Sequence, residues 1–222
     1  FDFPDAEACA VALADALGAA VVETLDKKAR ATLALSGGRS PEKVLPLLAA
    51  KHIDWARVDV TLVDDRRVAI DDPASNAGLV KRCFLDQGAT GARFVPLWQG
   101  DVDLEQALAA ADRRLANFLP ADVAYLGMGP DGHIASLFPA ENPEKFERDG
   151  FAVISSEAPS APHGRISLTF LELTKISKLF LHVTGAAKIE TLERALFNPP
   201  TPRLPVSLLI EARPDLTLFV CE

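Results

Sequence analysis

Residues 122–139, DVAYLGMGPDGHIASLFP, carry the pattern that decides the fold. The apolar run over 123–126 predicts a buried strand, and it stops at a glycine-rich turn. Glycine allows positive φ and lets the backbone approach a ligand closely. Asp131 and His133 add acid–base groups where the strand releases the chain. The stretch therefore predicts a strand that ends at a ligand-binding turn.

The string GMGPDG also fits the dinucleotide-binding pattern G-x-G-x-x-G. That pattern requires a long helix after the third glycine and an acidic residue about 20 positions further on. Pro139 follows only seven residues after Gly132, so no such helix fits. The sequence therefore argues against a nicotinamide cofactor.

Segments with helical and strand periodicity alternate along the chain. Helices are expected over 5–28, 41–50, 77–85, 104–118 and 186–197, and strands over 31–35, 58–63, 94–98, 151–155, 166–170, 178–183 and 216–221. The alternation favours an α/β fold with an open, mostly parallel sheet and helices on both faces. The proline-rich stretches 158–163 and 198–205 are too short to be linkers, so we expect a single domain over 1–222.

Composition narrows the partners and the compartment. The net charge of −8 over 222 residues argues against nucleic acid or an anionic membrane as a partner. Three scattered cysteines fit a reducing cytoplasm rather than a disulfide framework or a zinc knuckle. The sequence contains no run of 18 consecutive apolar residues, so we expect no membrane span. We expect a cytoplasmic monomer or small homo-oligomer that binds a small molecule.

Four polar motifs follow apolar runs, where the strands are expected to end. They are SGGRSP at 36–41, DDRR at 64–67, GMGPDGH at 127–133 and TGAAK at 184–188. Each has a simple structural explanation, such as a capped turn, an ion-paired loop or a solvated lysine. Ligands of open α/β sheets bind outside the carboxyl ends of the strands, so the shared position predicts one site.

Two of these motifs indicate an anion site. Paired glycines expose backbone N–H groups before the helix that Ser40 and Pro41 are expected to begin. Lys188 falls in the first turn of a helix, where the helix dipole disfavours a cation unless an anion is bound. Arg165 could bind phosphate oxygens as a fork. The expected phosphate-binding residues are Gly37, Gly38, Arg39, Ser40, Arg165 and Lys188.

The remaining motifs indicate proton-transfer chemistry. His133 lies between glycine turns beside Asp131, and histidine is the side chain best suited to exchange protons at neutral pH. Asp64 and Arg66 are expected at the rim of the cleft, whereas the other three histidines are expected to be structural or on the surface. We expect no metal, because no His/Asp/Glu cluster has ligand spacing. The sequence GGRSP also lacks the G-K-[ST] ending of a phosphate-binding kinase loop.

The combination of motifs resembles the 6-phosphogluconolactonase family over nearly the whole chain. The matching strings are LSGGRSP (35–41), VDDRRV (63–68), SN (75–76), GMGPDGHIASLFP (127–139), RISLT (165–169), VTGAAK (183–188) and PVSLL (205–209). The resemblance implies an isomerase-like, Rossmann-type three-layer fold, shared with glucosamine-6-phosphate deaminases. It implies hydrolysis of 6-phospho-D-glucono-1,5-lactone in the oxidative pentose phosphate pathway, without metal or cofactor.

The resemblance also implies roles in catalysis, namely proton transfer and stabilisation of negative charge. His133 would act as the general base on a water that attacks C1, and Asp131 would orient it. Arg66, beside Asp64, would stabilise the oxyanion or the product carboxylate. Asp65 stands where the family usually has glutamate, and Ala69 where it often has proline, which leaves the role of Asp65 open.

Two alternatives remain at this stage. The isomerase/deaminase branch reads G-H-I-A-F-N-E-P and carries a catalytic glutamate where this chain has Phe138, which favours a lactonase. A non-catalytic sugar-phosphate-binding module would keep the pocket without turnover. Regulatory relatives of that kind usually carry a DNA-binding module, and no helix-turn-helix segment is left over in this chain.

Overall fold

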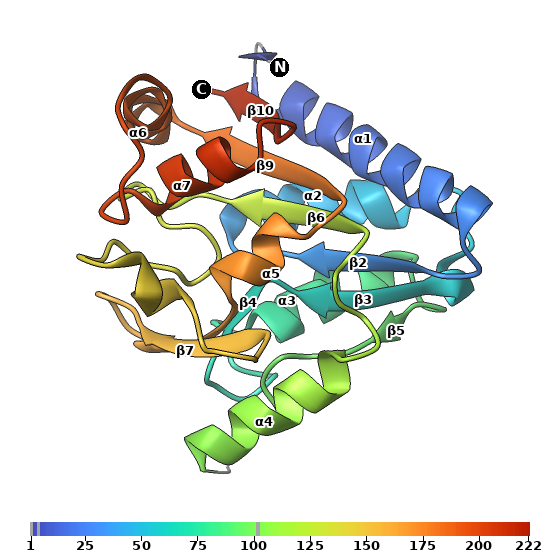
Figure 1. Ribbon diagram of the computed structural model, residues 1–222. Helices are drawn as coiled ribbons and strands as arrows, with labels where there is room; N and C mark the ends of the chain where they lie inside the picture. Colours follow the sequence, from blue (N-terminus) through green and yellow to red (C-terminus); the bar gives the residue numbers. More distant parts are fainter. Residues whose placement is uncertain (1, 4, 101–102) are drawn as a thin grey trace.

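A seven-stranded parallel sheet forms the centre of the protein in the computed structural model, which describes residues 2–3, 5–100 and 103–222 (Figure 1). The strand order is β1 (Asp2–Phe3), β10 (Thr217–Cys221), β9 (Lys178–Thr184), β6 (Val123–Gly127), β2 (Ala31–Leu35), β3 (Val58–Leu62) and β5 (Arg93–Phe94). Every neighbouring pair is parallel. The predicted open parallel sheet is confirmed. The strand expected over 94–98 is shorter than predicted, because Pro96 cannot donate to a ladder.

Helices cover both faces of this sheet, as predicted (Figure 1). One face carries α1 (Ala6–Lys27), α2 (Arg39–Ala49) and α3 (Asn76–Cys83). The other carries α5 (Phe170–Thr174), α6 (Ala186–Phe197) and α7 (Pro205–Ala212), while α4 (Leu104–Leu115) packs against β7. Short 3₁₀ turns occur at Trp55–Arg57, Leu85–Gln87 and Pro143–Phe146.

A second, antiparallel sheet lies beside the carboxyl end of β3. It contains β4 (Asp64–Arg66), β8 (Gly164–Leu168) and β7 (Val153–Glu157) in the order β4–β8–β7. The strands expected over 151–155 and 166–170 therefore exist with shifted bounds, but in this separate sheet. The first three residues of the motif DDRR form β4 because their backbone pairs with β8, so the motif is not a simple ion-paired loop. Arg66 lies opposite Arg165 in that register.

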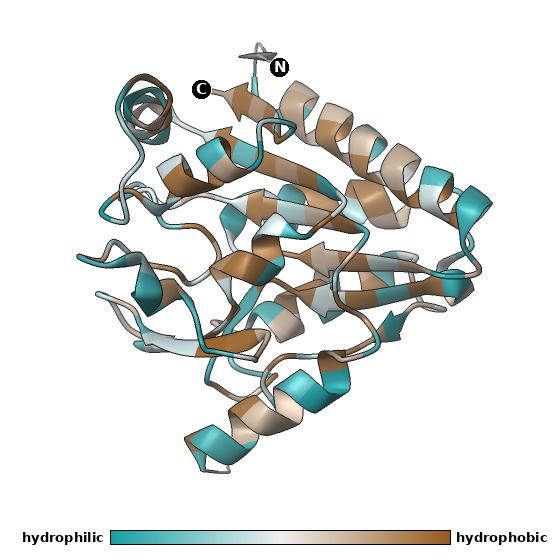
Figure 2. Ribbon diagram, in the orientation of Figure 1, coloured by the Kyte–Doolittle hydropathy of each residue, from teal (hydrophilic) through white to brown (hydrophobic). Residues whose placement is uncertain are grey.

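The long first helix belongs to the core. Asp5 caps it by accepting hydrogen bonds from the N–H groups of Glu7 and Ala8, at 3.0 and 2.8 Å. By length and composition alone α1 could also cross a membrane. Most of its large apolar residues, among them Leu13 and Leu17, are buried within the hydrophobic core, whereas Val11 and Val22 are exposed. Figure 2 shows the same concentration of hydrophobic residues in α1 and the central strands. Packing against the sheet thus accounts for its hydropathy.

Near the C-terminus the structure contains a helix that was not predicted from the sequence. The stretch 198–205 was expected as a proline-rich loop, but α7 begins at its last residue, Pro205, and includes the whole motif PVSLL at 205–209. Proline is favoured at the first position of a helix because its missing N–H would have no partner there. The helix expected over 41–50 begins earlier, at Arg39, and Pro41 is its third residue. Proline is tolerated there because the first four N–H groups of a helix have no partner within it.

Candidate active site

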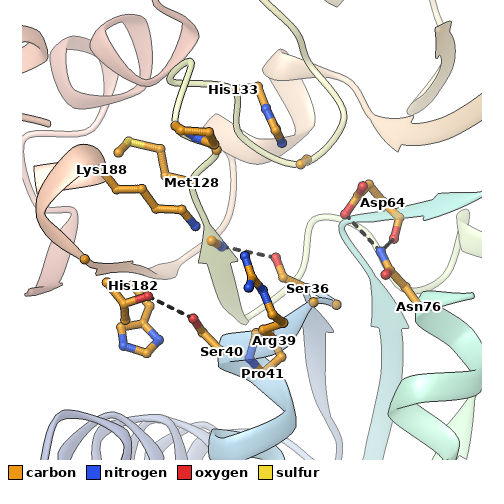
Figure 3. A pocket seen from close by; sticks show the side chains of 18 of the residues that line it. Ser36, Arg39, Ser40, Pro41, Asp64, Asn76, Met128, His133, His182 and Lys188 are labelled. Carbon is orange, nitrogen blue, oxygen red and sulfur yellow. Dashed lines mark hydrogen bonds between the residues drawn. The ribbon is translucent and has the colours of Figure 1, made fainter. Parts of the chain in front are cut away.

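The four predicted strand-end motifs meet at one cavity of about 620 Å³. It lies at the carboxyl ends of β2, β6 and β9, and it also takes in Asp64 and Arg66 of β4 (Figure 3). Residues from loops far apart in the sequence thus line a single cavity, in the position expected for the ligand site of an open α/β sheet. Asn76 and His182 line it as well.

His133 projects into this cavity, and Asp131 holds its ring (Figure 3). The imidazole Nδ1 lies 2.6 Å from Asp131 Oδ1, which also accepts the backbone N–H of His133 at 3.2 Å. Burial alone would raise the pKa of Asp131, but the hydrogen bonds and charge of His133 outweigh it, and the pKa is lowered. The ionised carboxylate therefore engages Nδ1 and leaves Nε2 as the nitrogen available to a ligand.

Phe138 and the backbone of the loop restrict the ring further. The aromatic ring of Phe138 packs on the imidazole, with the centroids 4.7 Å apart and the planes at 53°. Residues 133–139 contain no helix, in agreement with the argument from Pro139. Ala135, which lines the cavity, has φ of +48°, a left-handed conformation uncommon outside glycine. The histidine thus sits on a tightly shaped loop rather than on a flexible one.

The opposite wall is built from two helix N-termini. Gly38 at the start of α2 and Gly185 at the start of α6 have φ of +107° and +90° and carry no capping side chain. Ser40 Oγ and Thr184 Oγ1 lie 3.1 Å apart and connect the two helix starts. Exposed N–H groups at both helix ends make this wall suited to an anion.

Two cations reinforce the anion wall. Lys188 from α6 and Arg39 from α2 extend toward each other across it (Figure 3). Burial, followed by the positive charge of Arg39, lowers the pKa of Lys188, whereas Asp131 opposes the shift. Two cations held close together and partly out of water favour an anionic ligand, because such a ligand would compensate both charges.

The side chain of Asn76 packs directly against the backbone of Gly37. A Cβ at Gly37 would lie 2.0 Å from Asn76 Oδ1, so only glycine fits. The Asn76 amide donates to the backbone carbonyl of Asp64 at 2.9 Å, while Oδ1 is buried without a hydrogen-bond partner among the described residues. Asn76 was not predicted as a site residue, although the quoted pair SN at 75–76 was the signal.

The carboxylate of Asp64 connects two elements of the site. Its Oδ2 accepts a hydrogen bond of 2.5 Å from Ser136, on the loop that carries His133. Arg66 lines the same region and donates to the carbonyl of Ala74 at 2.5 Å. Asp65 points the other way and accepts the N–H groups of Asn76 and Ala77 at the start of α3. Asp65 therefore binds the N-terminus of α3 and does not line the cavity.

Arg165 lies elsewhere than expected, and His182 lines the cavity although it was not predicted as a site residue. Arg165 is buried and donates to the carbonyl of Pro162, and it is not among the described residues that line the cavity. Burial, followed by the charge of Arg66, lowers the pKa of this guanidinium. His182, expected to be structural or on the surface, is buried yet lines the cavity. Burial lowers the pKa of His182 to about 4, and the charge of Lys188 acts in the same direction.

The sequence matches one protein family over nearly its whole length. The family described as glucosamine-6-phosphate isomerases/6-phosphogluconolactonase matches residues 4–218. The chain belongs to this family. A 6-phosphogluconolactonase from Pseudomonas putida is 38% identical to it over 97% of this chain and 90% of that protein. One from Rhizobium meliloti is 38% identical over 94% of this chain and 91% of that protein.

Solved structures of the glucosamine-6-phosphate isomerase/6-phosphogluconolactonase family confirm the expected isomerase-like fold. A 6-phosphogluconolactonase from Shewanella baltica superposes with a TM-score of 0.92 at 32% identity, covering 100% of this chain and 96% of the other. A monomeric glucosamine-6-phosphate deaminase superposes with a TM-score of 0.80 at 18% identity, covering 100% of this chain and 96% of the other. The second likeness shows the shared fold alone.

Proposed function

We propose that this protein hydrolyses 6-phospho-D-glucono-1,5-lactone to 6-phosphogluconate, in the oxidative pentose phosphate pathway. The observation that carries the proposal is the imidazole of His133, held by Asp131 in a cavity whose opposite wall suits an anion. Relatives 38% identical over nearly the whole chain are named 6-phosphogluconolactonases. A phosphorylated ester substrate needs both halves of such a site.

The phosphate binds at the N-termini of α2 and α6. Backbone N–H groups after Gly37 and Gly38 and the hydroxyl of Ser40 donate to its oxygens. Arg39 and Lys188 supply charge-assisted hydrogen bonds. We leave Arg165 out of this set, because its guanidinium bonds to a backbone carbonyl and does not line the cavity.

The chemical step is attack of water on the lactone carbonyl. Nε2 of His133 takes a proton from the water as its oxygen bonds to C1 and the carbonyl electrons move onto oxygen. The intermediate collapses with cleavage of the C1–O5 bond, and the imidazolium returns the proton to O5. Asp131 remains ionised and stabilises the imidazolium through Nδ1.

Arg66 and Asp64 act on the other side of the reacting carbon. The guanidinium of Arg66 lines the cavity and stabilises the oxyanion, then the product carboxylate. Asp64 positions the His133 loop through its hydrogen bond with Ser136. Every step uses water, one base and fixed positive groups, so we propose a metal-independent hydrolase that needs no cofactor.

Further properties of the proposed enzyme follow from the whole chain. The family match over residues 4–218 supports one catalytic unit rather than two domains. All the side chains assigned to the reaction come from one chain, which supports an active monomer or small homo-oligomer. A net charge of −8 supports a cytoplasmic enzyme of small molecules without a nucleic-acid or membrane partner.

The test of this function measures the rate of lactone hydrolysis with the protein and subtracts the uncatalysed rate. Glucosamine-6-phosphate is assayed in parallel as a second substrate. Rapid lactone hydrolysis without release of ammonia is the expected result, because Phe138 packs on His133 and offers no carboxylate for ring opening. Ammonia release would instead identify a deaminase. Tight binding of sugar phosphates with no turnover of either would identify a binding module.

A further inference from the structure

Cys9, His182 and Cys221 form a compact cluster under the floor of the substrate cavity. Their ligand atoms all lie within 4.8 Å of one another, and Cys9 Sγ is 3.4 Å from Nε2 of His182. The three residues are 0%, 4% and 3% exposed. Two thiols and an imidazole nitrogen therefore face a common point inside the protein.

The fold assembles this cluster from both ends of the chain. His182 of β9 pairs with Phe219 of β10, so Cys221, two residues further on, projects from the same face of the sheet. Helix α1 packs on that face, and its Cys9 contacts His182 there. Because the three residues are so far apart in the sequence, no ligand spacing was visible there.

We propose that Cys9, His182 and Cys221 bind one Zn²⁺ ion, which fastens α1 to β9 and β10. Thiolate sulfur and imidazole nitrogen are the ligands that structural zinc sites use. Binding converts both thiols to thiolates and releases two protons to solvent. The resulting unit of one Zn²⁺, two thiolates and a neutral imidazole has no net charge, which reduces the cost of placing it in the core.

Tyr125 provides the support that a metal-binding histidine requires. Its hydroxyl lies 3.0 Å from Nδ1 of His182, from the neighbouring strand β6 and on the same face of the sheet. With Nδ1 hydrogen-bonded, the ring is held so that Nε2 is directed toward the sulfur of Cys9. Partners of this kind fix the tautomer and orientation of the ligand in zinc sites.

One ligand of the cluster, His182, borders open space. His182 lines the substrate cavity and a second cavity of about 250 Å³, which Ala6 and Ala10 of α1 also line. In the proposed site an ion reaches the imidazole from this side, and water serves as the fourth ligand of the tetrahedral shell. Hydrolysis is assigned to His133 and metal binding to His182 and the two thiols, so the two proposals are tested by different measurements and either can fail alone.

The first experiment measures metal binding by the whole chain. Protein kept reduced and treated with a chelator is titrated with Zn²⁺ and, separately, with Co²⁺. We expect one ion per chain, a higher melting temperature with Zn²⁺, and a thiolate-to-Co²⁺ charge-transfer absorption with the intense visible bands of tetrahedral cobalt. Absence of the charge-transfer absorption at saturating Co²⁺ overturns the proposal.

Variants then locate the site. Cys221→Ser is expected to weaken Zn²⁺ binding by about 100-fold or more and to remove one thiolate from the cobalt spectrum. Cys83→Ser is the matched control, because the third cysteine lies on α3 outside the cluster. Equal Zn²⁺ affinity in both variants overturns the assignment. Tyr125→Phe, which keeps the packed ring, should fold and bind Zn²⁺ about 10-fold more weakly; unchanged binding there contradicts the supporting role of Tyr125.

Discussion

Gly129 leaves the space in which the imidazole of His133 lies. A Cβ at Gly129 would be 2.2 Å from Nδ1 and Cε1 of that ring and 2.6 Å from Oδ1 of Asp131. The backbone of the turn thus sets the position of the ring directly, and a methyl group there has no room. The glycine pattern that first suggested a ligand-binding turn serves here to position the proposed base.

Replacing Gly129 with alanine should displace the ring without unfolding the protein. We expect kcat to fall by about 100-fold, since small displacements of catalytic groups have effects of that size. The measurement is lactone hydrolysis together with thermal unfolding. Gly18→Ala in α1 is the control, because a Cβ there makes only ordinary contacts of 3.4 Å or more. Unchanged activity in Gly129→Ala would show that the ring is not positioned by this contact.

Replacing Asp131 with asparagine should keep the turn but remove the charge beside Nδ1. We expect kcat to decrease by about 10- to 100-fold, because the imidazolium formed during the reaction loses its counter-ion. The KM should change little, since Asp131 does not line the cavity. Kinetics at pH 7 for this variant and for Asp26→Asn, on the exposed end of α1, separate the effect from a general loss of charge. A large increase in KM alone would place Asp131 in binding instead.

The lowered pKa of Asp131 also fixes the sign of its pH effect. A carboxylate whose pKa is lower in the folded protein contributes stability above its ordinary pKa of about 4, and that contribution is lost as the pH falls through the lowered value. The contribution of Asp131 to stability should therefore decrease as the pH falls below about 4. Urea unfolding between pH 5 and 3 checks it: the stability difference between the protein and Asp131→Asn should shrink as the pH falls, and a constant difference would contradict the lowered pKa.

Replacing Lys188 with alanine should weaken substrate binding. We expect KM to rise by about 10- to 100-fold with a much smaller change in kcat, because the ammonium interacts with the phosphate in both the ground and transition states. Lys175→Ala is the control; it follows α5 and forms an ion pair with Glu172, close to the amino end of β9 and away from the cavity. A decrease in kcat at unchanged KM would contradict the phosphate role.

Asp65 should make the protein less stable as the pH rises from 4 to 7. Burial raises the pKa of Asp65 from 3.8 to about 6, despite three backbone N–H donors, and the charge of Asp64 adds to the shift. A raised pKa in the folded state contributes stability below the unfolded value, and this is lost as the pH rises through the folded value. The shift corresponds to at most about 3 kcal/mol.

Asp65→Asn isolates this effect. The difference in the free energy of unfolding between Asp65→Asn and the unmodified protein should move in favour of the variant as the pH rises from 4 to 7. Asp71→Asn is the control: this residue is exposed in the turn that follows β4, and its variant should show no such trend. A constant difference for Asp65→Asn would mean that its carboxyl titrates normally.

Elements with strong periodicity and clear ends could be predicted from the sequence. The strand Ala31–Leu35 and the helix Ala186–Phe197 have the predicted bounds, because each is a periodic apolar segment that ends or begins beside glycine or a polar turn. The cavity was also predictable in outline, because parallel strands place their carboxyl ends at one edge.

Features that depend on distant pairing could not be predicted. The strand β4 is three charged residues long and exists because β8 pairs with it. The same pairing places Arg165 opposite Arg66, where its guanidinium bonds to the carbonyl of Pro162 instead of reaching the cavity. His182 became visible as a cavity residue only through the packing of α1, β6 and β10 around it.

The kinetics of His133→Ala test the central claim most directly. If His133 is the general base, kcat for the lactone falls by about 10²- to 10⁴-fold while KM stays within a few-fold of its original value. The folded state should be retained, because the ring is partly exposed at the cavity. Full activity in His133→Ala, with an unchanged melting temperature, would contradict the account.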